Sequence, residues 1–363
     1  TTTYMKIVTI VGARPQFIKA SAFSRVVAQT PGVTEVLVHT GQHFDDNMSE
    51  VFFREMDIPA PAYHFDIHSL SHGAMTGRML EAIEKVLAEE KPDFTLVYGD
   101  TNSTLAGALA ARKLHIKVAH VEAGLRSFNM AMPEEVNRIL TDRISDYLFC
   151  PTKVAIQNLE QEGFRHFPCL VAECGDIMYD AALYYKSKSD RESKILADLS
   201  LSPGQYHLAT IHRQENTDDK PRLQSIVEAL NQLNRSVQVI VPIHPRTRKL
   251  LDLYEIIPEF RMIPPVGYLD MIALTSQANL ILTDSGGLQK EAYFFGRYCV
   301  TLRDQTEWTE LVDGGYNILA GADTGRITEA AGLLANKKPG FEAGLYGDGH
   351  AAEFILAKLQ AGI

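Results

Sequence analysis

Apolar and polar positions form two kinds of pattern along the chain. Short apolar, β-branched runs predict strands, and the stretches between them have helical periodicity. In residues 75–90, for example, Met75, Met79, Ile83 and Val86 recur at helical spacing. The strands are expected at residues 6–11, 34–40, 94–98, 116–121, 147–150, 207–211, 237–242, 280–283 and 298–302. This alternation predicts an α/β fold in which helices cover both faces of parallel sheets.

The alternation of strands and helices occurs once in each half of the chain, so we predict two Rossmann-like, doubly wound lobes that face one cleft. The hinge is placed near Gly175, after a stretch at residues 163–174 that we interpret as irregular. The N-terminal lobe is then 5–174 and the C-terminal lobe 175–348, while the segment 349–363 carries a last helix that is a candidate to pack back across the cleft. In such folds ligands bind beyond the carboxyl ends of the strands, where we look for chemistry.

Composition limits the partners. No apolar run approaches the roughly 18 residues that a membrane span needs, so a membrane protein is not expected. The chain has 35 basic and 45 acidic residues, and the resulting net charge of -10 disfavours nucleic acid and anionic membrane surfaces. The four cysteines form no Cys-x-x-Cys pair and no signal peptide is recognisable, so we expect a cytoplasmic location and no metal site.

The first predicted strand runs into a turn with two cations. Gly12 permits a tight turn and Pro15 suits the start of a helix, so Arg14 and Lys19 are expected beside the positive end of that helix. Such an arrangement suits a diphosphate, although an ordinary turn with a solvated Arg and Lys explains it equally well. The dinucleotide motif Gly-x-Gly-x-x-Gly and the P-loop motif are both missing here, so no cofactor is predicted.

Three carboxylates follow predicted strand ends of the first lobe, at Asp100, Glu122 and Glu134. Each alone is more readily a helix cap than a catalyst. Together they indicate acid/base chemistry, because charges gathered in a cleft shift one another's pKa values.

In the second lobe, His212 and Arg213 follow one strand and His244 follows another. His212 is a candidate proton shuttle or phosphate donor, with a structural histidine as the alternative.

The sharpest single motif is Ser285-Gly286-Gly287, where a strand opens into a helix. Bare backbone N–H groups and the helix dipole can receive a phosphate there, and Glu291 further along is placed to accept ribose hydroxyls. The alternative is a turn of small residues needed for tight packing.

Six motifs, in order from residue 12 to residue 349, resemble the non-hydrolysing UDP-N-acetylglucosamine 2-epimerases. They are Gly12-Ala13-Arg14-Pro15, Gly99-Asp100-Thr101, His120-Val121-Glu122-Ala123-Gly124-Leu125-Arg126, Pro133-Glu134-Glu135-Val136-Asn137-Arg138, Thr283-Asp284-Ser285-Gly286-Gly287 and Tyr346-Gly347-Asp348-Gly349.

The resemblance implies the glycosyltransferase-B fold with a UDP-sugar in the interlobe cleft, a homodimer and no cofactor. It also implies roles for the matching positions: the catalytic residues are Asp100, Glu122, Glu134 and His212, the diphosphate neighbours are Arg14 and Lys19, and the ribose acceptor is Glu291. We add Arg213, His244, Ser285, Gly286, Gly287 and Arg303 as candidate substrate-binding residues.

The chain departs from the N-acetylglucosamine branch at Tyr98, Asn102 and Trp308. At these positions it resembles instead the UDP-2,3-diacetamido-2,3-dideoxyglucuronate 2-epimerases of bacterial O-antigen synthesis. A uronate carboxylate calls for a cation, and Arg246, Arg248 and Arg303 follow strand ends. UDP-N-acetylglucosamine as substrate, a glycosyltransferase of the same fold and a non-catalytic UDP-sugar-binding regulator are the alternatives.

Overall fold

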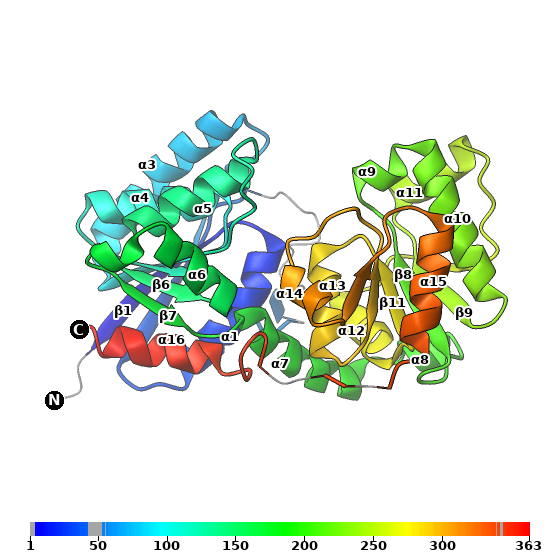
Figure 1. Ribbon diagram of the computed structural model, residues 1–363. Coiled ribbons are helices and arrows are strands. Elements are labelled where there is room, and N and C mark those ends of the chain that lie inside the picture. Colours follow the sequence, from blue (N-terminus) through cyan, green and yellow to red (C-terminus); the bar gives the residue numbers. More distant parts are fainter. Residues whose placement is uncertain (1–3, 43–52, 55, 339, 342–343) are drawn as a thin grey trace. The chain divides into compact units, whose positions relative to one another are not determined.

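The computed structural model describes residues 4–42, 53–54, 56–338, 340–341 and 344–363, which form two compact units (Figure 1). The first unit contains the described residues up to Ala181 and those from Gly344 onward, and the second runs from Ala182 to Phe341. The predicted hinge at Gly175 lies shortly before this division.

The first unit is built on a seven-stranded parallel sheet with the order β3-β2-β1-β4-β5-β6-β7. Its strands are β1 (Met5–Val11), β2 (Val33–His39), β3 (Tyr63–His64), β4 (Phe94–Tyr98), β5 (Lys117–Val121), β6 (Tyr147–Cys150) and β7 (Leu170–Glu173). The central strands β1 and β4 are buried almost throughout, which explains why they read as unbroken apolar runs.

Helices cover both faces of this sheet (Figure 1). They are α1 (Arg14–Ala28), α3 (His72–Glu90), α4 (Asn102–Lys113), α5 (Pro133–Ile144), α6 (Lys153–Gln161), the 3₁₀ helix η1 (Phe164–His166) and α16 (Ala351–Gln360). On one face α3 and α4 pack over a core of β1 and β4 side chains, and on the other the C-terminal α16 packs against α1. A Cβ at Gly107 of α4 would approach Ile10 to 3.0 Å, so glycine allows the close contact of this helix with the sheet.

The second unit repeats the plan with a six-stranded parallel sheet of order β10-β9-β8-β11-β12-β13. Its strands are β8 (Tyr206–Thr210), β9 (Gln238–Pro242), β10 (Arg261–Ile263), β11 (Leu280–Thr283), β12 (Cys299–Thr301) and β13 (Asn317–Leu319). Its helices are α8 (Ile195–Asp198), α9 (Gln214–Thr217), α10 (Lys220–Asn234), α11 (Pro245–Leu253), α12 (Tyr268–Gln277), α13 (Gly286–Phe294), α14 (Thr309–Asp313) and α15 (Thr324–Ala335), and α7 (Ile177–Glu192) runs into it from the first unit.

Two parallel sheets with covering helices confirm the predicted α/β, doubly wound class. The interpretation of residues 163–174 as irregular is wrong, because they contain η1 and the edge strand β7. The residues of β7 are exposed or only half-buried, so this strand lacks the apolar run that marks the central strands. A common cleft of the two lobes stays a prediction.

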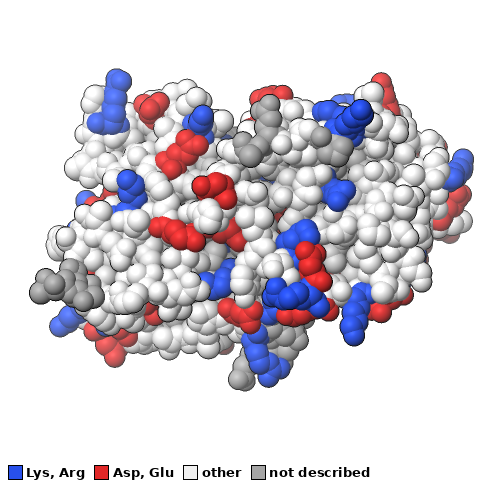
Figure 2. Space-filling model, turned by 90° about the horizontal axis from the view of Figure 1, so that it is seen from below, with Lys and Arg blue, Asp and Glu red and all other residues white. Residues whose placement is uncertain are grey.

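Among the described residues, no helix is both long and apolar enough to cross a membrane. On the face that Figure 2 shows, acidic and basic side chains are intermingled, and no broad area of the described residues there is basic alone. Any site for an anionic ligand on this face must therefore use a few local cations.

Candidate functional site

The turn from β1 into α1 is fixed from within the protein. The buried Gln16 side chain accepts from the amides of Gly12 (2.8 Å) and Ala13 (3.1 Å), and its own amide donates to the Tyr98 carbonyl (2.8 Å). The two N–H groups that precede the helix are therefore used internally, while Arg14 is half-buried at the first position of α1. Gln16 thus ties the ends of β1 and β4 together.

Lys19, further along α1, is paired with the predicted acid Glu122. Its Nζ lies 2.8 Å from each Glu122 carboxylate oxygen, and only 7% of the Glu122 side chain is exposed. Burial opposes the charged form of Lys19, yet the Glu122 carboxylate, with the charges of Asp176 and Asp100, raises the pKa of Lys19 above its ordinary value. Lys19 is therefore a cation that two of the predicted acids stabilise.

Glu122 itself has an unusual backbone, with a φ of 71° in the left-handed region. Residues without glycine's freedom hold this conformation only where the surrounding structure fixes it, and such residues gather at functional sites. Glu122 follows β5 directly, so its strained turn sets the direction in which the carboxylate leaves the sheet.

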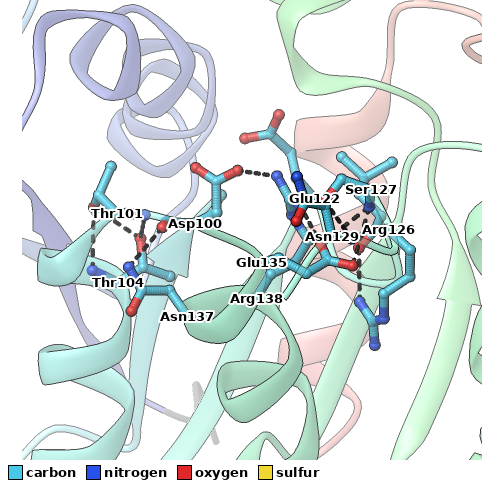
Figure 3. Close-up of polar contacts among 12 residues, drawn as sticks. Asp100, Thr101, Thr104, Glu122, Arg126, Ser127, Asn129, Glu135, Asn137 and Arg138 are labelled. Atoms are coloured by element: carbon cyan, nitrogen blue, oxygen red, sulfur yellow. Dashed lines mark hydrogen bonds and ion pairs between the residues drawn. The ribbon is translucent and has the colours of Figure 1, made fainter. Parts of the chain in front are cut away.

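Asp100 follows the neighbouring strand β4 and forms an ion pair with Arg138 of α5 (Figure 3). The same guanidinium pairs with Glu135, whose buried carboxylate also accepts from the amides of Ser127 and Phe128. Burial would lower the pKa of Arg138, but Asp100 and Glu135 raise it overall. Arg138 therefore joins the Asp100 turn to the loop before α5.

Asn137, next to Arg138, donates to the Asp100 carbonyl at 3.0 Å and to the Asn102 side chain at 3.1 Å (Figure 3). The predicted acid Glu134 lies in the first turn of the same helix and is exposed. Glu134 was predicted from the motifs as a candidate site residue, whereas Glu135, Asn137 and Arg138 beside it were not. Helical spacing was the available signal, since Arg138 lies one turn after the two glutamates.

In the second unit, the predicted His212 lies beside a buried aspartate that the motif analysis did not single out. His212 Nδ1 is 3.1 Å from Asp284 Oδ1, with 49% of the His212 side chain exposed and none of Asp284. Burial alone would raise the pKa of Asp284, but His212 and the amide of Arg213 hold it below its ordinary value. Asp284 thus orients the imidazole while about half of the side chain stays exposed.

The Ser285-Gly286-Gly287 motif opens α13 as predicted, but its surroundings differ from the expectation. The Ser285 hydroxyl accepts from the amide of Leu288 at 3.3 Å as the helix N-cap. A Cβ on Gly286 would lie 2.2 Å from Glu307 Oε1, so a side chain of this protein already explains the glycine. Gly287 is exposed.

Arg303 links this region to α9. Its Nη1 is 2.9 Å from the Glu307 carboxylate and its Nε 3.6 Å from Glu215. Among the described residues the buried Arg303 Nε has no hydrogen-bond partner, although 3.6 Å still allows attraction between the charges. Arg303 is therefore a buried cation with two carboxylate neighbours.

Glu291 of α13 is half-buried and accepts from the Tyr268 hydroxyl at 3.1 Å. Burial raises the pKa of Glu291 to about 7, against the opposing effects of Tyr268 and of the Lys290 charge. Its protonation therefore changes close to neutral pH.

Three further candidate residues of the second unit lie at the start of α11. His244 is exposed, and its Nδ1 accepts from the Arg246 amide at 3.2 Å as the N-cap. Arg246 pairs with Asp218 and donates to Thr217 at 3.0 Å, while Arg248 is exposed. Among the described residues, no group of three or more His, Cys, Asp or Glu side chains is placed to hold a metal ion.

Three comparisons bear on the family. The chain matches the family described as UDP-N-acetylglucosamine 2-epimerase over residues 25–360. It is 55% identical over 359 residues to the UDP-2,3-diacetamido-2,3-dideoxy-D-glucuronate 2-epimerase of Pseudomonas aeruginosa, which covers 98% of this chain and 100% of that protein. The crystal structure of the Methanocaldococcus jannaschii UDP-GlcNAc 2-epimerase in complex with UDP-GlcNAc and UDP has a TM-score of 0.85 at 43% identity and covers 99% of this chain and 100% of that one.

The chain belongs to the UDP-N-acetylglucosamine 2-epimerase family. It is thus an isomerase of the UDP-sugar 2-epimerase class, which confirms the family and the enzyme class that the motifs predicted. A Phytolacca americana protein crystallised with UDP-2fluoro-glucose and pterostilbene, at 11% identity and a TM-score of 0.59, shares the fold alone.

Proposed function

We propose that this enzyme inverts C2 of UDP-2,3-diacetamido-2,3-dideoxyglucuronate, giving the manno epimer. The observation that carries the choice of substrate is the 55% identity, over nearly the whole of both chains, to the Pseudomonas aeruginosa relative of that name. The departures at Tyr98, Asn102 and Trp308 support the same branch.

The chemistry of the substrate defines the mechanism. The C2 proton of a 2-acetamido sugar is not α to a carbonyl, so its removal needs help from the departure of UDP. Breaking the C1–O bond sends an electron pair to UDP and acidifies C2–H, and loss of that proton forms the C1–C2 double bond of a 2-acetamidoglycal. Re-addition of UDP to C1, with a proton delivered to the opposite face of C2, gives the epimer.

This mechanism needs proton-transfer groups on both faces of C2. In the α-gluco substrate C1–O and C2–H are anti, whereas in the manno product they lie on the same side. We assign the proton transfers to Asp100, Glu122 and Glu134; the first two follow neighbouring strands and lie beside the cations Arg138 and Lys19.

Cations and dipoles stabilise the departing UDP. We assign His212, Arg14 and Lys19 to the diphosphate, where positive charge favours the transition state. Glu291 accepts the ribose hydroxyls. The remaining UDP-sugar contacts are assigned to Arg213, His244, Ser285, Gly286, Gly287 and Arg303.

The carboxylate of the uronate needs a cationic partner. Arg246 and Arg303 already have carboxylate neighbours in the protein, whereas Arg248 is exposed on α11.

We infer that the enzyme acts as a homodimer in the cytoplasm and supplies O-antigen polysaccharide synthesis, as its resemblance to that branch implies.

One experiment separates this function from its alternatives. The enzyme is incubated in deuterated water with either UDP-sugar, and NMR follows C2. We expect deuterium at C2 without an added acceptor, and a higher kcat/KM for the diacetamido-glucuronate. Preference for UDP-N-acetylglucosamine would overturn the substrate; transfer that requires an acceptor, or binding without turnover, would instead favour a glycosyltransferase or a regulator.

A further inference from the structure

A fully buried histidine lies beneath the turns that carry two of the proposed acids. His120 belongs to β5, two residues before Glu122, and its side chain has no exposed surface. Its Nε2 lies 2.7 Å from the carbonyl oxygen of Gly99, the residue before Asp100. One ring edge therefore contacts the Asp100 turn directly.

The other ring edge reaches the Glu122 turn through an aspartate. His120 Nδ1 is 2.6 Å from Oδ1 of Asp142 in α5, which is also fully buried. Asp142 Oδ2 accepts from the amide of Gly124 at 3.0 Å, in the turn that follows Glu122. His120 and Asp142 therefore form a bridge from the backbone of one turn to the backbone of the other.

Asp142 is also in contact with an arginine. Arg126 Nη1 is 2.7 Å from Asp142 Oδ2, and the same side chain makes two 2.7 Å contacts with the Glu162 carboxylate. The Gly99 carbonyl can only accept, so His120 Nε2 donates the hydrogen bond between them. Buried polar groups satisfied in this way are rigid.

The Glu122 turn needs such support. Glu122 has a φ of 71°, whereas Gly99 at 67° has a conformation that glycine adopts freely, and the Gly99 amide donates to the Val121 carbonyl at 3.0 Å. Sparsely populated conformations persist only where the surroundings over-determine them. A change at His120 would release the Gly99 carbonyl and leave Asp142 without one of its partners.

We propose that His120 is a positioning residue, which sets the separation and direction of Asp100 and Glu122 without touching the substrate. This inference rests on the proposed function, in which these acids transfer protons to and from C2. A misplacement of about 1 Å can lower turnover about 100-fold, so we expect the effect in kcat. Binding of UDP is assigned to other residues and should be unaffected.

Two substitutions separate the two contacts of the ring. Asparagine places an amide N–H near the position of Nδ1, and glutamine places one near Nε2. His120→Asn therefore keeps a donor for Asp142 and loses the Gly99 contact, whereas His120→Gln keeps a donor for the Gly99 carbonyl. The control is His207→Asn, at the amino end of β8 in the second unit, where the histidine is also buried but its Nδ1 has no hydrogen-bond partner in the part of the chain that the structure describes.

We expect kcat of His120→Asn to fall about tenfold or more, with KM and the UDP dissociation constant within about twofold of wild type. His120→Gln should recover at least part of kcat, and His207→Asn should leave kcat unchanged. The inference is overturned if kcat of folded His120→Asn stays within about twofold of wild type, if His120→Gln is no better than His120→Asn, or if UDP affinity falls in step with kcat.

A second position protects the test against misfolding of the histidine variants. Asp142→Asn keeps the shape of the side chain and removes its charge, so it should lower kcat in the same way; wild-type kcat in this variant would also overturn the inference. If the wild-type enzyme is inactive on both UDP-sugars, the proposed function is contradicted. If the wild-type enzyme is active and the His120 variants are equally active, only the positioning role is contradicted.

Discussion

Asp100 and Glu122 each have a cation as neighbour, Arg138 for the first and Lys19 for the second. If these acids and the exposed Glu134 transfer protons, replacing any one by its amide removes a proton-transfer group and little volume. We expect Asp100→Asn, Glu122→Gln and Glu134→Gln each to lower turnover by roughly 10²-fold or more. Steady-state kinetics and UDP titration of the same samples would measure the effect.

The matched control for these variants is Glu84→Gln, which replaces an exposed carboxylate on α3 of the same unit. It should keep wild-type turnover, because no proposed site residue lies near it in the helix. UDP should bind all the variants. Turnover close to wild type in all three acid variants would remove the assignment of these acids.

The limits of sequence analysis at the residue scale are visible at Arg138 and Asp284. Arg138 pairs with Asp100 from 38 positions away, and Asp284 accepts from the His212 amide across 72 positions. The position of an acidic residue at a strand end makes it a candidate for the site. Which cation or histidine lies beside that acid can be seen only in the folded chain. At Gly286 the sequence suggested a glycine that lets a phosphate approach the backbone. The structure shows that a Cβ at this position would instead collide with the Glu307 side chain.

Among the elements, burial decided which strands could be predicted. β4 and β8 are buried along their whole length and were evident as apolar runs. The edge strands β3 and β7, in contrast, have only two and four residues, and these are exposed or half-buried. Their pairing comes from the neighbouring strand and not from their own apolar pattern.

The C-terminal helix α16 offers a test at the same scale. Asp180 in the first turn of α7 accepts from the amides of Ala351 (3.1 Å) and Ala352 (2.8 Å), which open α16. Asp180→Ala removes this cap, so we expect the free energy of unfolding to fall by about 0.5–2 kcal/mol. Urea denaturation followed by circular dichroism would measure the change.

Asp190→Ala on α7 is the control, since Asp190 is half exposed and pairs at the surface with Lys186 at 2.7 Å. Its effect should stay within about 0.5 kcal/mol. Equal effects of the two substitutions would show that the contact with α16 contributes nothing to stability.

At the scale of the whole molecule, each unit has its own parallel sheet, and the proposed roles divide between them. The three proton-transfer acids belong to the first unit, whereas His212, the α13 turn and Glu291 belong to the second. The repeated rhythm of strands and helices was enough to predict this two-lobed plan. The helix expected in residues 349–363 is α16, which belongs to the first unit; its partners there, α1 and α7, lie far away in the chain and could not be identified from the sequence.

Because Glu291 belongs to the second unit, we predict that this unit makes UDP binding depend on pH. Burial raises the pKa of Glu291 to about 7, and an ionised carboxylate accepts from ribose hydroxyls more strongly than a protonated one does. Protonation therefore competes with UDP, so affinity should fall about tenfold from pH 8 to pH 6 as a result of this group. Without UDP the sign is opposite: the stability that a raised pKa contributes is present at low pH and lost as pH rises through about 7.

Glu291→Gln isolates this effect from the other groups that titrate, including UDP itself. Its amide cannot ionise, so UDP affinity at pH 8 should be weaker than in wild type, and the change between pH 8 and pH 6 should be about tenfold smaller. In the absence of UDP the variant should melt at a higher temperature than wild type at pH 8, with the difference shrinking towards pH 5. Calorimetric titration and thermal melts across this range provide both measurements. If wild type and Glu291→Gln lose UDP affinity in parallel as the pH falls, Glu291 is not the ribose acceptor, and the assignment of the UDP site to α13 must be revised.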